Sequence, residues 1–273
     1  MKKLLLTVAS VVAWVAIGAY LVAAVRMCNR EKEGMKLANI RVVIEDSARM
    51  KIVTPAMVRG WLAGAVRPGM DMGRINTSEL RQTVLEHLFV SSARVYTNLR
   101  GELVVKLTQR RPIARVSLDN GYNFYITDDY FVLPPQSHET VYVPVITGVF
   151  TPPFARDFVG EMAPLVQKEK KLPENYIFTS KLINFVKFIE GDDFWRSEIV
   201  QICVVGSGRE PQIEIVPRSG RHVVAVGAPD DVEKKMDKLL AFYRRALRYE
   251  GWESYGRIDI RFEGQVVCTK NGL

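Results

Sequence analysis

The chain has 273 residues, of which 48% are hydrophobic and 25% are charged, and its formal net charge is +8 at pH 7. These values are ordinary for a globular protein and exclude a low-complexity or disordered chain. The basic residues are scattered and form no motif of a known nucleic-acid reader, which argues against nucleic acid as a partner. The positive charge therefore indicates either simple solubility or attraction to an anionic surface, such as lipid headgroups or a cell-wall polymer.

An uncharged apolar run extends from Leu4 to Val25 and follows two lysines. It is about as long as a helix that crosses a hydrocarbon core of ~30 Å. A cleavable signal peptide is the alternative, because small residues occur near the end of the run, but the apolar part of such peptides is typically about 7–15 residues long. We therefore predict an uncleaved anchor with the bulk of the chain outside the cytoplasm. The predicted segments are a cytoplasmic tail at 1–3, a transmembrane helix at 4–25 and a tether at 26–37.

The next part of the chain alternates strand and helix signals in a compact order. Residues 38–44 are β-branched and predict a strand, and Thr54-Pro55 is a typical helix start. A second helix start at Asn76 is followed by two predicted strands at 90–98 and 102–109, with a turn at 99–101. The apolar positions expected to face the core are Met57, Val58, Trp61, Leu62 and Ala65 in the first helix and Leu80, Val84, Leu85 and Leu88 in the second. The order β-α-α-β-β over residues 38–110 predicts a small two-layer α+β module.

A second domain is expected after Arg110-Arg111-Pro112, which interrupts the pattern. Residues 134–173 are rich in proline and are predicted to be irregular. Helices are expected at 175–189 and from 230 to 247, and strands at 113–117, 123–127, 130–133, 198–205, 212–216, 221–226, 257–262 and 265–269. This order predicts a mainly antiparallel sheet with helices on one side.

No pattern of catalytic or metal-binding residues occurs, so we predict neither an enzyme nor a bound metal or cofactor. His87, His138 and His222 are far apart and lack metal-ligand spacing, and His87 is interpreted as complementing the dipole at a helix end. Gly206-Ser207-Gly208 joins two predicted strands and is read as a hairpin turn, not as a phosphate loop. The acidic pairs at 128–129 and 192–193 are explained by turn chemistry.

Three cysteines occur, and none lies in a C-x-x-C pair. Cys203 and Cys268 lie in strand-like runs, where a buried thiol acts as a small hydrophobe. A disulfide between these two residues is the alternative for an exported chain. Cys28 follows Met27 and not a small residue, so we do not expect lipoprotein processing.

The last predicted strands are apolar and nearly terminal. A final strand often lies at the edge of a sheet, where it can accept a strand from another chain. The alternative is that these residues only complete the core. From the residues alone, we regard the two readings as equal.

Five segments are similar to those of a known family: Leu88–Val95, which enters a strand, Arg110–Ala114 at the domain junction, the turn Asp128–Val132, Pro144–Gly148 and the closing strand Ile258–Phe262. Together they resemble the bacterial FtsQ/DivIB family of cell-division proteins. The resemblance implies a cytoplasmic tail, one membrane span, a POTRA domain at 38–111 and a β domain at 112–273. It also implies a single-pass protein of the inner membrane, at the division septum, with its bulk in the periplasm.

The resemblance further implies a scaffold that binds FtsB- and FtsL-like bitopic proteins through the C-terminal edge of the β domain. It implies recruitment of other division proteins through the POTRA domain and a part in the control of septal peptidoglycan synthesis. The expected partner-binding residues are Ile258, Ile260, Arg261, Phe262, Val266, Val267 and Thr269. A POTRA-bearing envelope assembly or transport factor is the alternative function, and a secreted enzyme with an unrecognised site is a further one.

Overall fold

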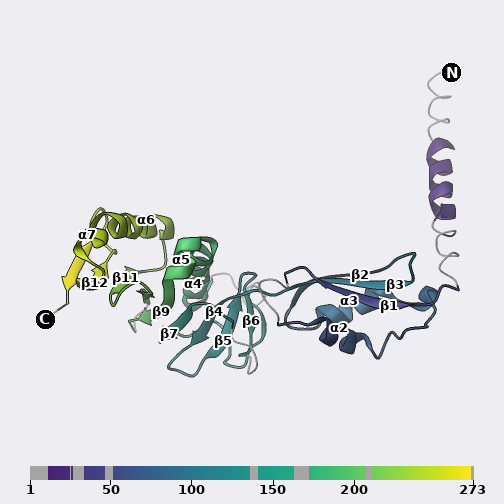
Figure 1. Cartoon of the computed structure of the whole chain (residues 1–273), viewed down its shortest axis with the longest axis horizontal. Coiled ribbons are helices and arrows are strands. Elements are labelled where there is room, and N and C mark those ends of the chain that lie inside the picture. Colours follow the sequence, from purple (N-terminus) through teal and green to yellow (C-terminus); the bar gives the residue numbers. More distant parts are fainter. Residues whose placement is uncertain are drawn as a thin grey trace, which may run out of the picture. The chain divides into compact units, whose positions relative to one another are not determined.

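The computed structural model describes residues 12–24, 26, 34–46, 52–135, 141–162, 172–206 and 211–271 (Figure 1). The chain divides into two compact units, Met1–Gln109 (unit 1) and Arg110–Leu273 (unit 2). Residues 12–24 are helical, and among the described residues no helix is both long and apolar enough to cross a membrane. The predicted tail, the rest of the predicted span and residues 27–33 of the predicted tether lie outside the described residues.

Unit 1 contains a three-stranded sheet in the order β1-β3-β2. Its elements are β1 (Asn39–Ile44), α2 (Pro55–Leu62), the 3-10 turn η1 (Met72–Arg74), α3 (Thr77–Leu85), β2 (Val90–Thr97) and β3 (Glu102–Gln109). β1 runs parallel to β3, and β2 runs antiparallel to it. Parallel neighbours need a long crossover, which the helical segment between β1 and β2 supplies. Thr54 caps α2 by accepting from the N–H of Met57, and Asn76 caps α3 in the same way.

The core of unit 1 lies between this sheet and its two helices. Its buried side chains include Val58, Leu62, Leu80 and Val84 from the helices and Leu103, Val105 and Leu107 from β3. Met57, Ala65 and Leu88, which were predicted to face the core, are exposed instead. α2 has only eight residues, with Met57 in its first turn and Ala65 beyond its last residue, and Leu88 follows the end of α3.

Unit 2 contains a ten-stranded sheet in the order β13-β12-β11-β10-β9-β7-β4-β5-β6-β8. The strands are β4 (Pro112–Ser117), β5 (Asn123–Thr127), β6 (Phe131–Leu133), β7 (Val145–Gly148), β8 (Gly160–Glu161), β9 (Ile199–Val205), β10 (Gln212–Pro217), β11 (Val223–Gly227), β12 (Tyr255–Asp259) and β13 (Val267–Lys270). The pairs β4–β7, β7–β9 and β11–β12 are parallel, and the other neighbouring pairs are antiparallel. The predicted mixed α+β class is confirmed.

The prediction that residues 134–173 are irregular is wrong for two segments. β7 lies in the middle of the sheet between β4 and β9, and β8 forms one of its edges. Gly148 ends β7 with a φ of +98°, a backbone conformation that favours glycine. A Cβ at this position would overlap the carbonyl group of Val204 on β9. Residues 136–140 and 163–171 lie outside the described residues.

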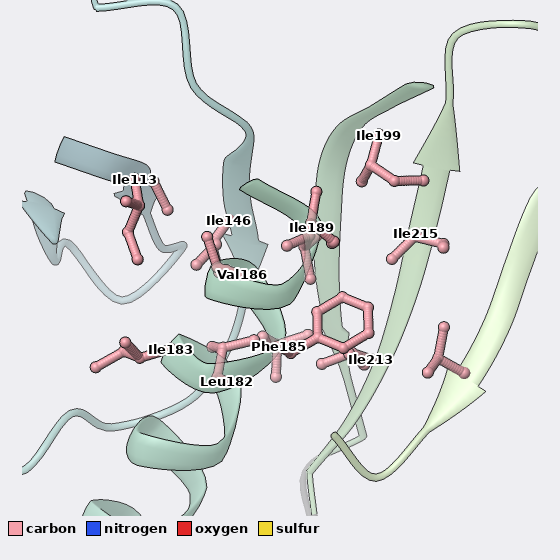
Figure 2. Packing of buried hydrophobic residues seen from close by; sticks show 14 of the residues in the cluster. Ile113, Ile146, Leu182, Ile183, Phe185, Val186, Ile189, Ile199, Ile213 and Ile215 are labelled. Carbon is pink, nitrogen blue, oxygen red and sulfur yellow. The ribbon is translucent and has the colours of Figure 1, made fainter. Parts of the chain in front are cut away.

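Helices α4 (Glu174–Gly191), α5 (Asp193–Glu198) and α6 (Val232–Phe242) belong to unit 2. α5 was not predicted, and α6 continues through a π-helical turn (Tyr243–Leu247) into α7 (Arg248–Glu250). The long helix α4 packs against the sheet, and Figure 2 shows this contact at close range. The buried side chains there are Leu182, Ile183, Phe185, Val186 and Ile189 from α4 and Ile113, Ile146, Ile199, Ile213 and Ile215 from the strands. This core holds the ten-stranded sheet against α4.

Candidate partner-binding edge

β13 is the last strand of the ten-stranded sheet, and within the described residues it pairs only with β12. The two strands are antiparallel, with Ile258 opposite Cys268 and Asp259 opposite Val267. Gly264, with a φ of +70°, lies in the turn between them. The outer side of β13 therefore presents the backbone N–H and C=O groups that a neighbouring strand would otherwise bond. The opposite edge strand, β8, has only two residues.

The side chains of Ile258 and Ile260 belong to the core. Both are fully buried, and the backbone N–H of Ile260 donates to the carbonyl of Ala225 on β11 at 3.0 Å. β12 itself is paired on both sides, by β11 and β13. These two predicted residues thus hold β12 in place, and their side chains are not available on the surface.

Arg261 is engaged by its own unit. Its Nε donates to both carboxylate oxygens of Asp259 at 3.0 Å, and its Nη2 lies 2.6 Å from one of them. Its Nη1 donates to Gln212 of β10 at 3.2 Å. The arginine lowers the pKa of Asp259 through these hydrogen bonds. Arg261 therefore ties β12 to β10, across Gly227 of β11, where a Cβ would approach its side chain to 3.0 Å.

The predicted strand at 257–262 is wrong in its extent, because β12 ends at Asp259. The β-branched and aromatic pattern continues to Phe262, but Arg261 turns back to bond Asp259, and the chain enters the turn around Gly264. Phe262 thus lies in the connection before β13, with 45% of its surface exposed.

Exposed and partly buried side chains alternate from Val266 to Thr269. Val267 is 46% exposed and Thr269 is exposed, whereas Val266 and Cys268 pack against the core of unit 2. Residues two apart in a strand share a face, so Val267 and Thr269 form one exposed face of the edge strand.

Two lysines of α6 hold the connection between β12 and β13. Lys238 donates to the backbone carbonyl of Phe262, and Lys234 pairs with Glu263. The pairing raises the pKa of Lys234 and lowers that of Glu263. Sequence reasoning missed this contact, although lysines four residues apart on a helix lie on the same face and were the available signal.

The far end of β13 is fastened by Asn271. Its N–H donates to the carbonyl of Ser254 at 3.3 Å, and its Nδ2 donates to the carbonyl of Glu253 at 2.9 Å. Its side-chain oxygen lies over Gly256, where a Cβ would overlap it. The edge strand is therefore held at both ends, while no described strand pairs with its outer side.

The histidines occupy separate environments. His222 is fully buried, and its Nε2 lies 2.9 Å from the Tyr243 hydroxyl. Burial lowers the pKa of His222. The ring of His87 stacks on that of half-buried Trp61, with 3.5 Å between centroids, and burial also lowers its pKa. His87 follows the end of α3, and its suggested interaction with the helix dipole stays a prediction. His138 lies outside the described residues.

The part of the chain that the structure describes contains neither a metal site nor a disulfide. No group of three or more His, Cys, Asp or Glu side chains there could hold a metal ion. Cys203 and Cys268 are free thiols. They lie on β9 and β13, four strand spacings apart, or ~19 Å, whereas bridged Cα atoms lie within about 7 Å. The alternative of a disulfide between them is therefore wrong, and Cys28 lies outside the described residues.

Comparison with known proteins gives one family match, and it covers the ten-stranded sheet that ends in β13. A family model described as FtsQ/DivIB, C-terminal related, matches residues 111–269. The match begins at the start of unit 2 and ends within β13. No curated protein matches the chain.

Proposed function

The chain belongs to the FtsQ/DivIB C-terminal-related family of bacterial cell-division proteins, and we propose that it is a non-enzymatic scaffold of the division machinery. In this proposal, unit 2 binds FtsB- and FtsL-like bitopic proteins, and the chain thereby helps control septal peptidoglycan synthesis. The observation that carries the proposal is the open outer side of β13.

Strand addition is the binding mode that this edge suits. A partner segment that adds beside β13 would form main-chain hydrogen bonds, which supply affinity, and its alternate side chains would supply register. The contacts that hold both ends of β13 favour this mode. Because the strand is already ordered, binding does not carry the entropic cost of ordering it. We propose that Val267 and Thr269 line the contact face.

Phe262 is the proposed anchor of the interface. It is half-exposed, and its backbone is already held by Lys238. Truncation of an aromatic residue in a desolvated interface centre often costs on the order of 2 kcal/mol or more of binding free energy. Arg261 would contribute mainly by holding β12, because Asp259 and Gln212 already occupy its guanidinium.

We propose that residues 38–111 form a POTRA domain that recruits other division proteins. The support is the β-α-α-β-β order of unit 1 and its sheet order β1-β3-β2. We further propose that the apolar run from Leu4 to Val25 anchors the chain in the inner membrane, with residues 1–3 in the cytoplasm and the bulk of the chain in the periplasm at the septum. The remaining residues, 112–273, would form the β domain.

Binding of an FtsB-like partner to the full chain in detergent tests the proposed function. The variant Val267→Pro removes a backbone donor from β13, and Phe262→Ala removes the anchor. Leu99→Ala is the matched control, because Leu99 is also an exposed apolar residue but lies in unit 1. We expect both edge variants to weaken binding at least tenfold while circular dichroism stays unchanged, and the control to bind normally.

Full-strength binding by folded Val267→Pro and Phe262→Ala proteins would refute the proposed edge. Crosslinking in cells, followed by purification of the chain with its partners, tests the alternative function. Recovery of an outer-membrane barrel protein from crosslinked cells, in place of bitopic division proteins, would favour an envelope assembly or transport factor.

A further inference from the structure

A cavity of about 600 Å³ opens in unit 2 away from β13. Its walls come from β4, β5, the segment 141–145, the end of α4, α5 and the start of β9, together with Arg218. This volume lies within the range of roughly 300–1,000 Å³ typical of ligand sites. The strand register accounts for part of the floor, because Arg115 of β4 lies opposite both Tyr125 of β5 and Val145 of β7.

Within the described residues, two cations of this cavity, Arg115 and Arg218, form no ion pair with a carboxylate. Arg115 lies with its guanidinium 5.9 Å from the centre of the Tyr125 ring, and its Nε is enclosed without a hydrogen bond in the described part of the chain. Arg218 donates to the hydroxyl of Tyr142 and lies 5.5 Å from that ring's centre. A buried, unpaired donor on a charged group carries an energetic penalty, which an incoming anion would remove.

The carboxylates of the cavity are only partly free to neutralise these cations. Asp193 pairs with Arg196 on the neighbouring turn of α5, at 2.5 Å. Glu190 is half-buried at the end of α4, and burial raises its pKa, although Arg111 and Arg196 oppose the shift. The cavity thus keeps a net positive character, with Glu190 as the group that would repel an anionic ligand.

Apart from Ser197, the remaining lining is apolar, which restricts the class of ligand. The apolar lining residues are Val141, Val143, Pro144, Val145, Ile199 and Val200. A guanidinium binds a carboxylate through two parallel hydrogen bonds, and the aliphatic walls would cover an apolar neighbour of that carboxylate. A hydroxyl-rich sugar would leave its polar groups unpaired against these walls.

We propose that this cavity binds an acidic peptide segment, with a carboxylate at Arg115 and Arg218 and aliphatic side chains against the valine and isoleucine walls. The site lies apart from the β13 edge and goes beyond the proposed strand addition. It would give unit 2 a second contact with a partner chain that carries alternating acidic and aliphatic residues.

Fluorescence anisotropy with the full chain in detergent tests this site. The probe is a labelled octapeptide of alternating leucine or valine and glutamate or aspartate, and its analogue carries glutamine and asparagine instead. We expect the acidic peptide to bind, and the neutral analogue to bind at least tenfold more weakly. Arg115→Gln should weaken binding by roughly tenfold or more, because a charge-assisted pair is lost. Glu190→Gln should tighten it, because a repulsive charge is removed.

Arg94→Gln is the matched control, since it makes the same change of net charge at an exposed position of unit 1. The proposal is overturned if the neutral analogue binds as well as the acidic peptide, or if Arg94→Gln weakens binding as much as Arg115→Gln. Polyphosphate that binds more tightly than the peptide, with the same dependence on Arg115, would overturn the assignment to a peptide. Unchanged binding of an FtsB-like partner by Arg115→Gln would show that the variant is folded and that the two sites are separate.

Discussion

Replacement of Gly148 by alanine should break the junction between β7 and β9, near the middle of the ten-stranded sheet. Gly148 lies opposite Val204 and has a φ of +98°. An added Cβ would overlap the Val204 carbonyl oxygen and lie 3.0 Å from its carbon and 3.1 Å from the Val204 nitrogen. The left-handed backbone costs an L-residue roughly 1–2 kcal/mol, and loss of one ladder hydrogen bond costs about 1 kcal/mol. Separation of the strands also loosens packing under α4, so we expect a total loss of about 3–5 kcal/mol.

Denaturant unfolding of the full chain, followed by tryptophan fluorescence, measures this loss. Gly206→Ala is the control, because Gly206 also has a positive φ, of +88°, but a Cβ there meets nothing within 4 Å. It should cost only the backbone term, about 1–2 kcal/mol. Equal destabilisation by the two variants would refute the close approach of β7 to β9.

Three further predictions concern substitutions of single residues. Burial lowers the pKa of His222, so the stability that the neutral ring contributes is full above the usual pKa of about 6.5 and falls as the pH drops toward the lowered pKa. His222→Gln should therefore reduce the loss of stability at acid pH, measured as the denaturant midpoint against pH. An unchanged pH dependence of the midpoint would contradict this prediction. Trp61→Ala should destabilise unit 1 by roughly 2 kcal/mol, because Trp61 stacks on His87. This is less than the loss expected for a fully buried tryptophan, since Trp61 is only half-buried. An unchanged melting temperature in calorimetry would show that the stacked pair does not stabilise the fold. Gly256→Ala should displace Asn271, so hydrogen exchange at 267–270 should rise while β9 and β10 remain protected.

The elements with regular apolar spacing were predicted well from the sequence. The strands of unit 1 and the helix α4 have patterns that span several residues, so local periodicity and burial agree. β7 was missed because it is four residues long and lies in a proline-rich segment. Its strand conformation depends on parallel pairing with β4 and β9, which no local pattern encodes.

The candidate edge was predicted in outline, but the roles of its residues were not. The alternation from Ile258 onward correctly indicated strands, yet it could not reveal that Asp259 and Arg261 bond each other and end β12. The cavity around Arg115 was not predicted, because its lining comes from segments between β4 and Arg218. These segments come together only through the pairing of the strands in the folded sheet, so no local sequence pattern indicates the cavity.

Site-specific photocrosslinking at β13 tests whether a partner protein adds a strand beside it. A photoreactive residue placed at Thr269 in dividing cells should crosslink to a small bitopic division protein. The same residue at Glu161, on the opposite edge strand β8, is the control. We expect a crosslink from Thr269 and none to that partner from Glu161. A partner crosslinked equally from both edges, or from Glu161 alone, would contradict strand addition at β13.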